Sequence, residues 1–264
     1  MRKSMKRLLV SGALALASLS AGAAAIAAGG EIKLPSKQWH FQGPFGTYDR
    51  SAAQRGYQVY QEVCAACHSM SLMYYRNLMA LGLTEGQVKS LIKDIQVPDL
   101  NDDGQPIERP AKLSDRFKSP FPNALAAAAA NNGKAPPDLS VIAKARAGGP
   151  DYLYGLLIGY VPYDKLTPQQ IKEFDVSKDD NFNKYFPGHK IGMAPPLADD
   201  KVTYADGTKA TLDQEASDVT QFLAWAAEPH MEARKRTGVR VILFLLALAG
   251  LMYAVKRSVW ADKH

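Results

Sequence analysis

The stretch "YQEVCAACHSMS" (residues 60–71) holds the only two cysteines of the 264-residue chain, Cys64 and Cys67, and His68 follows the second cysteine directly. Tyr57 precedes Cys64 by seven residues, which places both on one face of a helix. The sequence therefore predicts an amphipathic helix that runs into the motif. Two thiols and an imidazole at the end of a helix limit the chemistry to a few classes.

Three common uses of a cysteine pair fit this motif poorly. A disulfide across two residues closes a very small loop, which stabilises little and is usual for a redox-active pair. A thioredoxin-like site would need a βαβ context, which the residues around Cys64 do not provide. Zinc would need two more ligands, and the chain has no second C-x-x-C and no H-x-x-x-H. A scaffold that holds a disulfide stays open as the alternative to a cofactor site.

The C-x-x-C-H spacing is typical of covalent haem attachment. In that chemistry two thiols add to the two vinyl groups along one porphyrin edge, and the histidine that follows reaches the iron from one face. We therefore expect Cys64 and Cys67 to form the two thioethers of one haem c, and His68 to be the proximal iron ligand.

The sixth iron ligand decides between an open site for oxygen or peroxide chemistry and a closed site for electron transfer. The stretch "FPGHKIGMAPPLADD" (residues 186–200) offers Met193 and His189. Gly192 permits close approach and the prolines after Met193 fix the backbone, so the loop can hold a thioether rigidly. We expect Met193 to ligate, because a thioether raises the potential of an electron carrier. The alternatives are a bis-histidine site with His189 and an ordinary core role for Met193.

Both ends of the chain carry segments that relate to a membrane. Residues 1–28 begin with four basic residues and continue as an alanine-rich apolar stretch, which predicts a cleaved secretory signal peptide. A second apolar run, residues 241–255, is bracketed by Arg240 and Lys256. This run is at the short end for a membrane span, but the basic residues that bracket it can lengthen the usable segment and favour a membrane-spanning helix over a buried core helix.

These segments together predict the topology, because the signal exports the chain and the late span stops transfer. We expect a periplasmic domain over residues 29–230, an anchor helix over 231–258 and a cytoplasmic tail over 259–264, in a single-pass protein of the bacterial inner membrane. The whole chain has a net charge of +6, but residues 29–230 hold 21 Lys and Arg against 24 Asp and Glu. The domain therefore lacks the basic surface of a nucleic-acid-binding protein.

Several segments resemble one family, cytochrome c1, the haem subunit of the ubiquinol–cytochrome c reductase (cytochrome bc1) complex. They follow the order of that family over most of the chain: "RGYQVYQEVCAACHSM", "KLSDRF", "ANNGKAPPDLSVIAKARAGGPDYLYGLLIGY", "YFPGHKIGMAPPL", "YADGTKATLDQEASDVTQFLAWAAEP" and the basic residues around the last apolar run. A generic class-c cytochrome does not share the whole set.

The resemblance implies roles for further residues at the haem. Arg146 resembles the arginine that pairs with a haem propionate, and its planar guanidinium suits a carboxylate bidentately. Asn131 and Tyr152 resemble the companions of that arginine. Pro137 resembles a proline packed beside the proximal histidine, and Tyr60 an aromatic residue that lines the haem edge. The alternative is a solvated helix residue for Arg146 and ordinary core positions for the two tyrosines.

The resemblance also implies an electron-transfer subunit of the quinol–cytochrome c oxidoreductase. Such a subunit takes one electron at a time from the Rieske iron–sulfur protein and passes it to a soluble or membrane-tethered cytochrome c, beside cytochrome b in a dimeric complex. It makes and breaks no bonds itself. A stand-alone membrane-anchored cytochrome c that feeds an oxidase is the alternative. The chain lacks the extra cysteines of some bacterial members, and its acidic stretches are modest, so the electron acceptor is not predicted.

The fold expected from these patterns is mainly α-helical. It has a class-c cytochrome core of three packed helices, surface insertions, a small hairpin and one C-terminal transmembrane helix. Helices are predicted from about residue 51 into the motif and over residues 84–95, 123–132, 139–148, 150–160 and 212–228.

Local signals predict the ends of some elements. Asp138 is placed to cap the helix that follows it, and Thr211 with Gln214 matches a capping box. The alternation around Asp206 and Gly207 predicts a hairpin. Residues 98–122, rich in proline, aspartate and lysine, are predicted to form a surface excursion.

Overall fold

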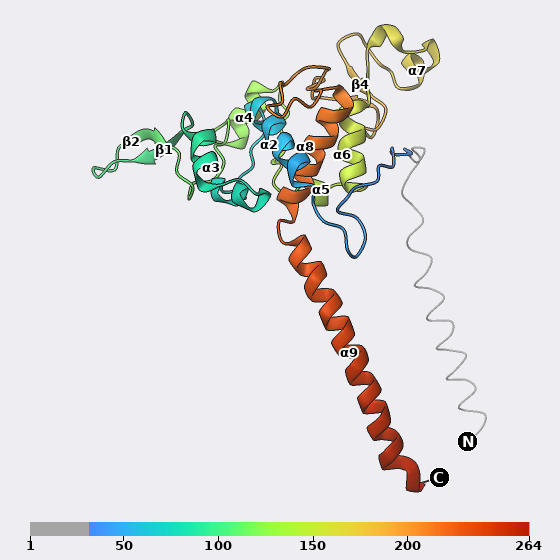
Figure 1. Cartoon of the computed structure of the whole chain (residues 1–264). Coiled ribbons are helices and arrows are strands. Elements are labelled where there is room, and N and C mark those ends of the chain that lie inside the picture. The colour runs from blue at the N-terminus through green and yellow to red at the C-terminus, as the bar shows by residue number, and fades with distance from the viewer. Residues whose placement is uncertain (1–31, 264) are drawn as a thin grey trace, which may run out of the picture. The chain divides into compact units, whose positions relative to one another are not determined.

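The computed structural model describes residues 32–263, so the predicted signal peptide lies outside the described residues. This part of the chain is mainly helical, as predicted (Figure 1). Its α-helices are α2 (Arg50–Glu62), α3 (Glu85–Ile92), α4 (Ala124–Ala130), α5 (Ile142–Ala145), α6 (Gly149–Ile158), α7 (Pro168–Glu173), α8 (Leu212–Ala227) and α9 (Met231–Trp260). Short 3-10 turns are η1 (Cys64–Ala66), η2 (Tyr75–Leu81), η3 (Tyr163–Lys165) and η4 (Ala261–Lys263).

The strands form two small antiparallel sheets. One sheet pairs β1 (Gln96–Leu100) with β2 (Pro106–Pro110), and the other has the order β3 (Tyr160–Val161), β4 (Asn181–Asn183), β5 (Lys190–Ile191). Neither sheet contributes the main core, which lies among the helices.

Helix α2 begins where the sequence predicts, because Asp49 accepts a hydrogen bond from the backbone N–H of Ala52 at 3.0 Å. Such a cap satisfies one of the amide groups that the first turn leaves unpaired. The helix buries one face, which includes Tyr57 and Tyr60, and passes directly into η1. The cysteine motif therefore lies at the end of the predicted amphipathic helix.

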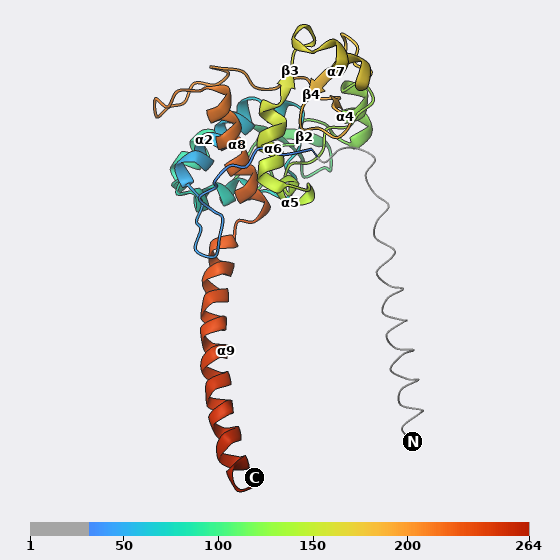
Figure 2. The ribbon, with the colours of Figure 1, turned by 90° about the vertical axis from the view of Figure 1, so that its right-hand side faces the viewer.

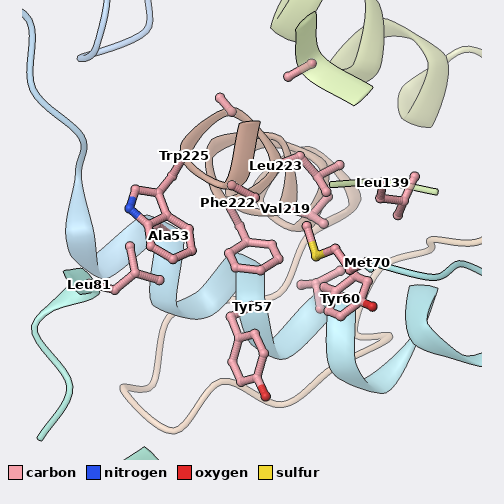
Figure 3. Packing of buried hydrophobic residues seen from close by; sticks show 14 of the residues in the cluster. Ala53, Tyr57, Tyr60, Met70, Leu81, Leu139, Val219, Phe222, Leu223 and Trp225 are labelled. Carbon is pink, nitrogen blue, oxygen red and sulfur yellow. The ribbon is translucent and has the colours of Figure 1, made fainter. Parts of the chain in front are cut away.

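The central contact of the fold is the crossing of α2 and α8 (Figures 1 and 2). Gly56 permits this close approach, because a Cβ atom there would lie 2.0 Å from the carbonyl oxygen of Asp218. Beside the crossing, Arg55 donates to both carboxylate oxygens of Asp218, at 2.8 and 3.0 Å. Figure 3 shows Phe222 reaching from α8 toward α2, and the rings of Tyr57 and Tyr60 both pack on its ring.

Helix α8 also packs against α5 and α6 (Figure 2). The core therefore consists of α2, which leads into the motif, α6 in the middle and the late helix α8, as predicted, with the short helix α5 packed beside α6 and α8. Pro150 lies in the first turn of α6, where its missing N–H costs no hydrogen bond.

Two predicted caps differ from the structure. Thr211 accepts from the N–H of Gln214 at 3.2 Å, but the side chain of Gln214 donates to Asp218 instead of completing a capping box. The prediction that Asp138 caps the helix after it is wrong. Helix α5 begins at Ile142 with no side-chain cap, and the carboxylate of Asp138 accepts from the backbone N–H of Ser140, two residues before that helix, and from the segment after His68.

The predicted hairpin around Asp206 is also wrong in position. The N–H of Val202, which a strand ladder would use, donates to the carboxylate of Glu215 at 3.0 Å, and Asp206 accepts from the N–H of Thr208. The hairpin of this protein is β1–β2, inside the stretch predicted as a surface excursion. Its loop is built by Asn101, whose side chain accepts from two backbone N–H groups.

Of the described helices, α9 is long and apolar enough to cross a membrane, by length and composition. Its apolar side chains are exposed. The helix begins at the first residue of the predicted anchor and continues two residues past the predicted boundary at residue 258.

Candidate haem-binding site

The cysteine motif forms one tight turn at the end of α2. The backbone N–H groups of Cys67 and His68 both donate to the carbonyl oxygen of Cys64, at 3.1 and 2.9 Å. Cys64 is partly buried, Cys67 is exposed, and both are free. The turn therefore brings the two thiols and the imidazole to one place on the surface of the core.

The imidazole of His68 is held in a form that can bind a metal. Its Nδ1 lies 2.8 Å from the carbonyl oxygen of Pro137. A carbonyl only accepts, so Nδ1 carries the proton and Nε2 keeps its lone pair. Burial lowers the pKa of His68, which favours the neutral imidazole. Ligating histidines in proteins are oriented in this way by a second hydrogen bond.

Asp138, the residue after Pro137, ties down the turn that follows His68. Its carboxylate accepts from the Ser69 hydroxyl at 2.9 Å and from the backbone N–H groups of Ser71 and Ser140, both at 2.8 Å. Burial alone would raise the pKa of Asp138, but the hydrogen bonds from Ser140 and Ser71 hold it well below its usual range. Asp138 therefore stays ionised and fixes the segment that carries the histidine.

The cysteines lack the properties of a redox-active pair. Burial, with a smaller contribution from Cys67, raises the pKa of the Cys64 thiol to about 12. Reactive pairs have lowered thiol pKa values, so a protonated Cys64 argues against thiol–disulfide exchange. A zinc site is not favoured either, because no three His, Cys, Asp or Glu side chains of the described residues are grouped to hold a metal ion.

The loop that carries Met193 is fixed on two sides. The hydroxyl of Tyr160 donates to the carbonyl oxygen of Met193 at 3.1 Å. A Cβ atom on Gly192 would lie 2.7 Å from Cδ of Lys134, so the lysine side chain packs directly on this glycine where the two loops touch. Lys134 belongs to the segment that leads to Pro137. The structure therefore joins the segment that orients His68 to the loop of the second candidate ligand.

Arg146 is an exposed guanidinium near this loop. It donates to the carbonyl oxygen of Ala145 at 3.2 Å, and it makes no ion pair with any carboxylate of the described residues. Burial raises the pKa of Tyr152, and the positive charge of Arg146 acts in the opposite direction, so the guanidinium lies within electrostatic range of the Tyr152 hydroxyl. Tyr152 in turn lies near Tyr160. A cation without an acidic partner at this place fits the propionate of a haem.

The two other residues implied by the resemblance have structural contacts. Tyr60 is buried, its hydroxyl donates to the carbonyl oxygen of His68 at 3.4 Å, and its ring packs on Phe117 and Phe222. Asn131 ends α4, because its side-chain amide donates to the carbonyl oxygen of Ala127 at 2.8 Å.

A cavity of about 460 Å³ opens beside the motif turn, where Tyr60, Ala65 and Phe117 are among the residues that line it. Neither His68 nor Met193 lines this cavity.

Comparison with known proteins decides the family. The model described as "Cytochrome C1 family" matches residues 39–263. The chain belongs to the cytochrome c1 family. This confirms the resemblance seen in the sequence.

Three relatives of this cytochrome c1 family member cover most of its length. The chain is 47% identical to "Cytochrome c1" of Rhodospirillum rubrum, over 98% of each chain. It is 45% identical to "Cytochrome c1, heme protein, mitochondrial" of Saccharomyces cerevisiae, over 87% of this chain and 73% of the relative. It is 43% identical to "Cytochrome b-c1 complex catalytic subunit, mitochondrial" of Candida albicans, over 86% and 77%.

In this cytochrome c1 family member, the histidine alternative for the sixth ligand is engaged elsewhere. The ring of His189 packs on Phe174, at 4.2 Å between centroids, and stacks on Phe182 at 5.3 Å. Its Nδ1 lies 3.0 Å from the carbonyl oxygen of Asn183. The two ring contacts place the imidazole in a small second cluster of apolar residues, which includes Phe182.

Two residues of the site were not predicted there from the sequence. Tyr160 reaches Met193 across 33 positions through a backbone carbonyl, a contact that no local pattern indicates. Asp138 directly follows Pro137, and that adjacency was the available signal for its place at the motif.

Proposed function

We propose that this chain is the haem-carrying electron-transfer subunit of a ubiquinol–cytochrome c reductase. In this proposal it receives one electron at a time from the Rieske iron–sulfur protein and delivers it to a soluble or membrane-tethered cytochrome c. The observation that carries the proposal is the His68 imidazole, oriented by Pro137 on a turn that also presents two free cysteines. Family membership supports the place in a cytochrome b-containing complex, which the name of the Candida albicans relative states for that protein.

The residues present fit a haem c. Cys64 and Cys67 would form its two thioethers, His68 would bind the iron through Nε2, and Met193 would bind through its sulfur. Arg146, with Tyr152 beside it, would bind a propionate. A haem held there supplies a one-electron couple between ferric and ferrous iron.

The protein's part in this function is to hold and orient the groups that would bind the haem. The hydrogen bond from Nδ1 to Pro137 keeps the imidazole in one tautomer, and the Asp138 clamp keeps the turn in place. Tyr160 fixes the Met193 loop. Because these groups are already positioned, transfer of an electron needs little rearrangement of the protein, and no bond is made or broken.

The place in the cell follows from the two terminal segments. Helix α9 would anchor the chain as a single span, and the predicted signal peptide would put residues 29–230 on the periplasmic side. The haem turn would then lie on the same side of the membrane as a periplasmic cytochrome c.

The Met193→Leu variant tests the ligand assignment. Leucine keeps the size of the side chain but removes the sulfur, so we expect the midpoint potential to fall by roughly 0.1 V or more, within the ~0.8 V range that axial ligands span. We also expect reduced protein to bind carbon monoxide. A redox titration and a carbon monoxide difference spectrum of the full-length protein measure both effects.

Met79→Leu is the matched control, because Met79 is an exposed methionine outside the candidate ligand loop. Its potential should not change. If Met193→Leu also keeps the original potential and refuses carbon monoxide, Met193 is not the ligand.

A further inference from the structure

A short loop, residues 40–47 ("HFQGPFGT"), precedes α2 and is held in a single shape. The N–H of Thr47 donates across the loop to the carbonyl oxygen of His40 at 3.1 Å. Gly43 has a φ of +72°, and a Cβ atom on Gly46 would lie 2.0 Å from the carbonyl oxygen of Gln42. Only glycine fits these two positions, so the loop has a built turn rather than a loose tip.

This loop exposes one aromatic side chain and buries its neighbours. Phe45 at the tip is 80% exposed, whereas Phe41 and Tyr48 at the base are buried and pack on each other. Phe41 also stacks on the ring of Trp39. The loop therefore displays an apolar ring on a rigid, well-packed base, where it is available for contact.

The loop is bound to the first turns of α9. Lys235 donates from Nζ to the carbonyl oxygens of Phe41, at 2.6 Å, and Gly46, at 3.2 Å. The N–H of Tyr48 donates to the carboxylate of Glu232 at 2.9 Å. Both views of the ribbon show the blue segment before α2 beside the start of α9 (Figures 1 and 2).

The position of Lys235 along α9 shows how far the loop lies from the apolar part of that helix. Lys235 lies six residues before Val241, where the apolar run begins, which is about 9 Å along a helix. The headgroup layer on each side of a bilayer is roughly 5–8 Å thick. A loop attached at this height has its tip next to the headgroups of any membrane that α9 spans.

Two basic side chains complete this surface. Arg236 and Arg240, one helical turn apart on α9, are exposed and form no ion pair with the carboxylates of residues 32–263. The neighbouring Arg234 and Lys235 are already bound to the head, by Glu228 and by the loop carbonyls. Arginines at this depth suit lipid phosphates.

We propose that loop 40–47 is a membrane-contact element. It places Phe45 in the outer headgroup layer, and Arg236 and Arg240 bind the phosphates of anionic lipids beside it. This second point of contact fixes the tilt of the domain relative to the bilayer, which a single helix cannot do. The inference depends on α9 as an anchor and not on the electron-transfer reaction.

A nitroxide spin label on Phe45→Cys tests the proposal. The matched control is Leu125→Cys, since Leu125 is 82% exposed and is not part of the loop or of α9. The full-length protein is reconstituted in vesicles of phosphatidylcholine and phosphatidylglycerol. Collision of each label with dissolved oxygen and with a water-soluble nickel chelate is then measured by electron paramagnetic resonance. The absorption spectrum of each variant verifies that it has folded.

We expect the label at residue 45 to be several-fold less accessible to the nickel chelate than the label at residue 125, and more accessible to oxygen. The protection should weaken when phosphatidylglycerol is omitted or when Arg236 and Arg240 are changed to Gln. Equal accessibility of the two labels to nickel overturns the proposal. Protection that arises only when other subunits of a complex are present also overturns it, because the surface then binds protein.

Labelling of the parent chain serves as a separate control. If the parent takes up the reagent, Cys64 and Cys67 are free and the proposed function fails, while the label at residue 45 is still measured by difference.

Discussion

His68 is fixed from two directions, by Pro137 at its ring and by Asp138 at the turn after it. The resemblance to the family implied the place of Pro137 beside the histidine, but the clamp by Asp138 was not predicted. Aspartate before a helical pattern usually indicates a cap, and here the side chain accepts from Ser140 in the segment that follows and also from Ser69 and Ser71. The local sequence pattern therefore identified Asp138 correctly as a hydrogen-bond acceptor but did not indicate its contacts with Ser69 and Ser71.

Replacement of Asp138 by Asn tests this clamp. Asparagine keeps the shape but loses the charge and one acceptor, so a buried N–H is left poorly paired. We expect the free energy of unfolding of the haem-loaded protein to fall by about 1–3 kcal/mol. Denaturant titration followed by the haem absorption measures it. Asp94→Asn is the control, because Asp94 is 88% exposed. Equal midpoints for both variants would show that the clamp contributes nothing.

Glu215 is a buried carboxyl that, unlike Asp138, is expected to destabilise the fold when it is ionised. It is fully buried, its Oε1 accepts from Val202, and its Oε2 has no hydrogen-bond partner among the described residues. Burial raises the pKa of Glu215, and the charges of Asp199 and Asp200 add to this. The folded state therefore prefers the protonated form. Below the unfolded pKa of about 4.3 the carboxyl costs nothing, and above the raised folded-state pKa its ionisation destabilises the fold.

Glu215→Gln should therefore stabilise the protein at pH 8, by about 1 kcal/mol or more, and have little effect at pH 4. Unfolding free energies of the variant and the parent at both pH values measure the difference. The exposed Glu173→Gln serves as the control and should show no such dependence. A loss of stability at pH 8 would mean that the charged carboxylate is well compensated in the fold.

At the scale of elements, the crossing of α2 and α8 positions the motif, because the turn of Cys64 extends directly from α2. The buried pair of Arg55 and Asp218 fixes the register of the two helices. The helices themselves were predictable, since periodicity and the caps are local. The hairpin was not, because Glu215 takes the N–H of Val202 from a distant part of the chain and removes it from any ladder.

Gly56→Ala tests the crossing. The added methyl group would lie against the backbone of Asp218, so the helices must separate, and we expect a loss of about 1–3 kcal/mol and a lower melting temperature. Gly86→Ala in α3 is the matched control. Its Cβ meets nothing within 4 Å, so alanine there should leave stability unchanged or raise it slightly. If both variants melt at the same temperature, the close approach is not needed.

For the whole molecule, the joint between the domain and α9 decides where the haem turn lies above the membrane. Glu232 accepts from the backbone of Tyr48 and pairs with Arg50, and Lys235 binds the loop that carries Phe45. The order of signal and apolar run predicts the topology. It could not predict this joint, because the contacts link residues nearly 200 positions apart and depend on the folded arrangement.

The most direct measurement purifies this chain from gently solubilised membranes. It records the reduced-minus-oxidised spectrum of the preparation together with its quinol–cytochrome c reductase activity. We expect a c-type haem accompanied by b-type haem, a [2Fe–2S] signal and inhibitor-sensitive turnover. A single c-type haem that emerges alone and inactive toward quinol would contradict the proposed place in the reductase and favour a stand-alone tethered cytochrome. A chain without covalent haem would contradict the whole account of the Cys64–His68 turn.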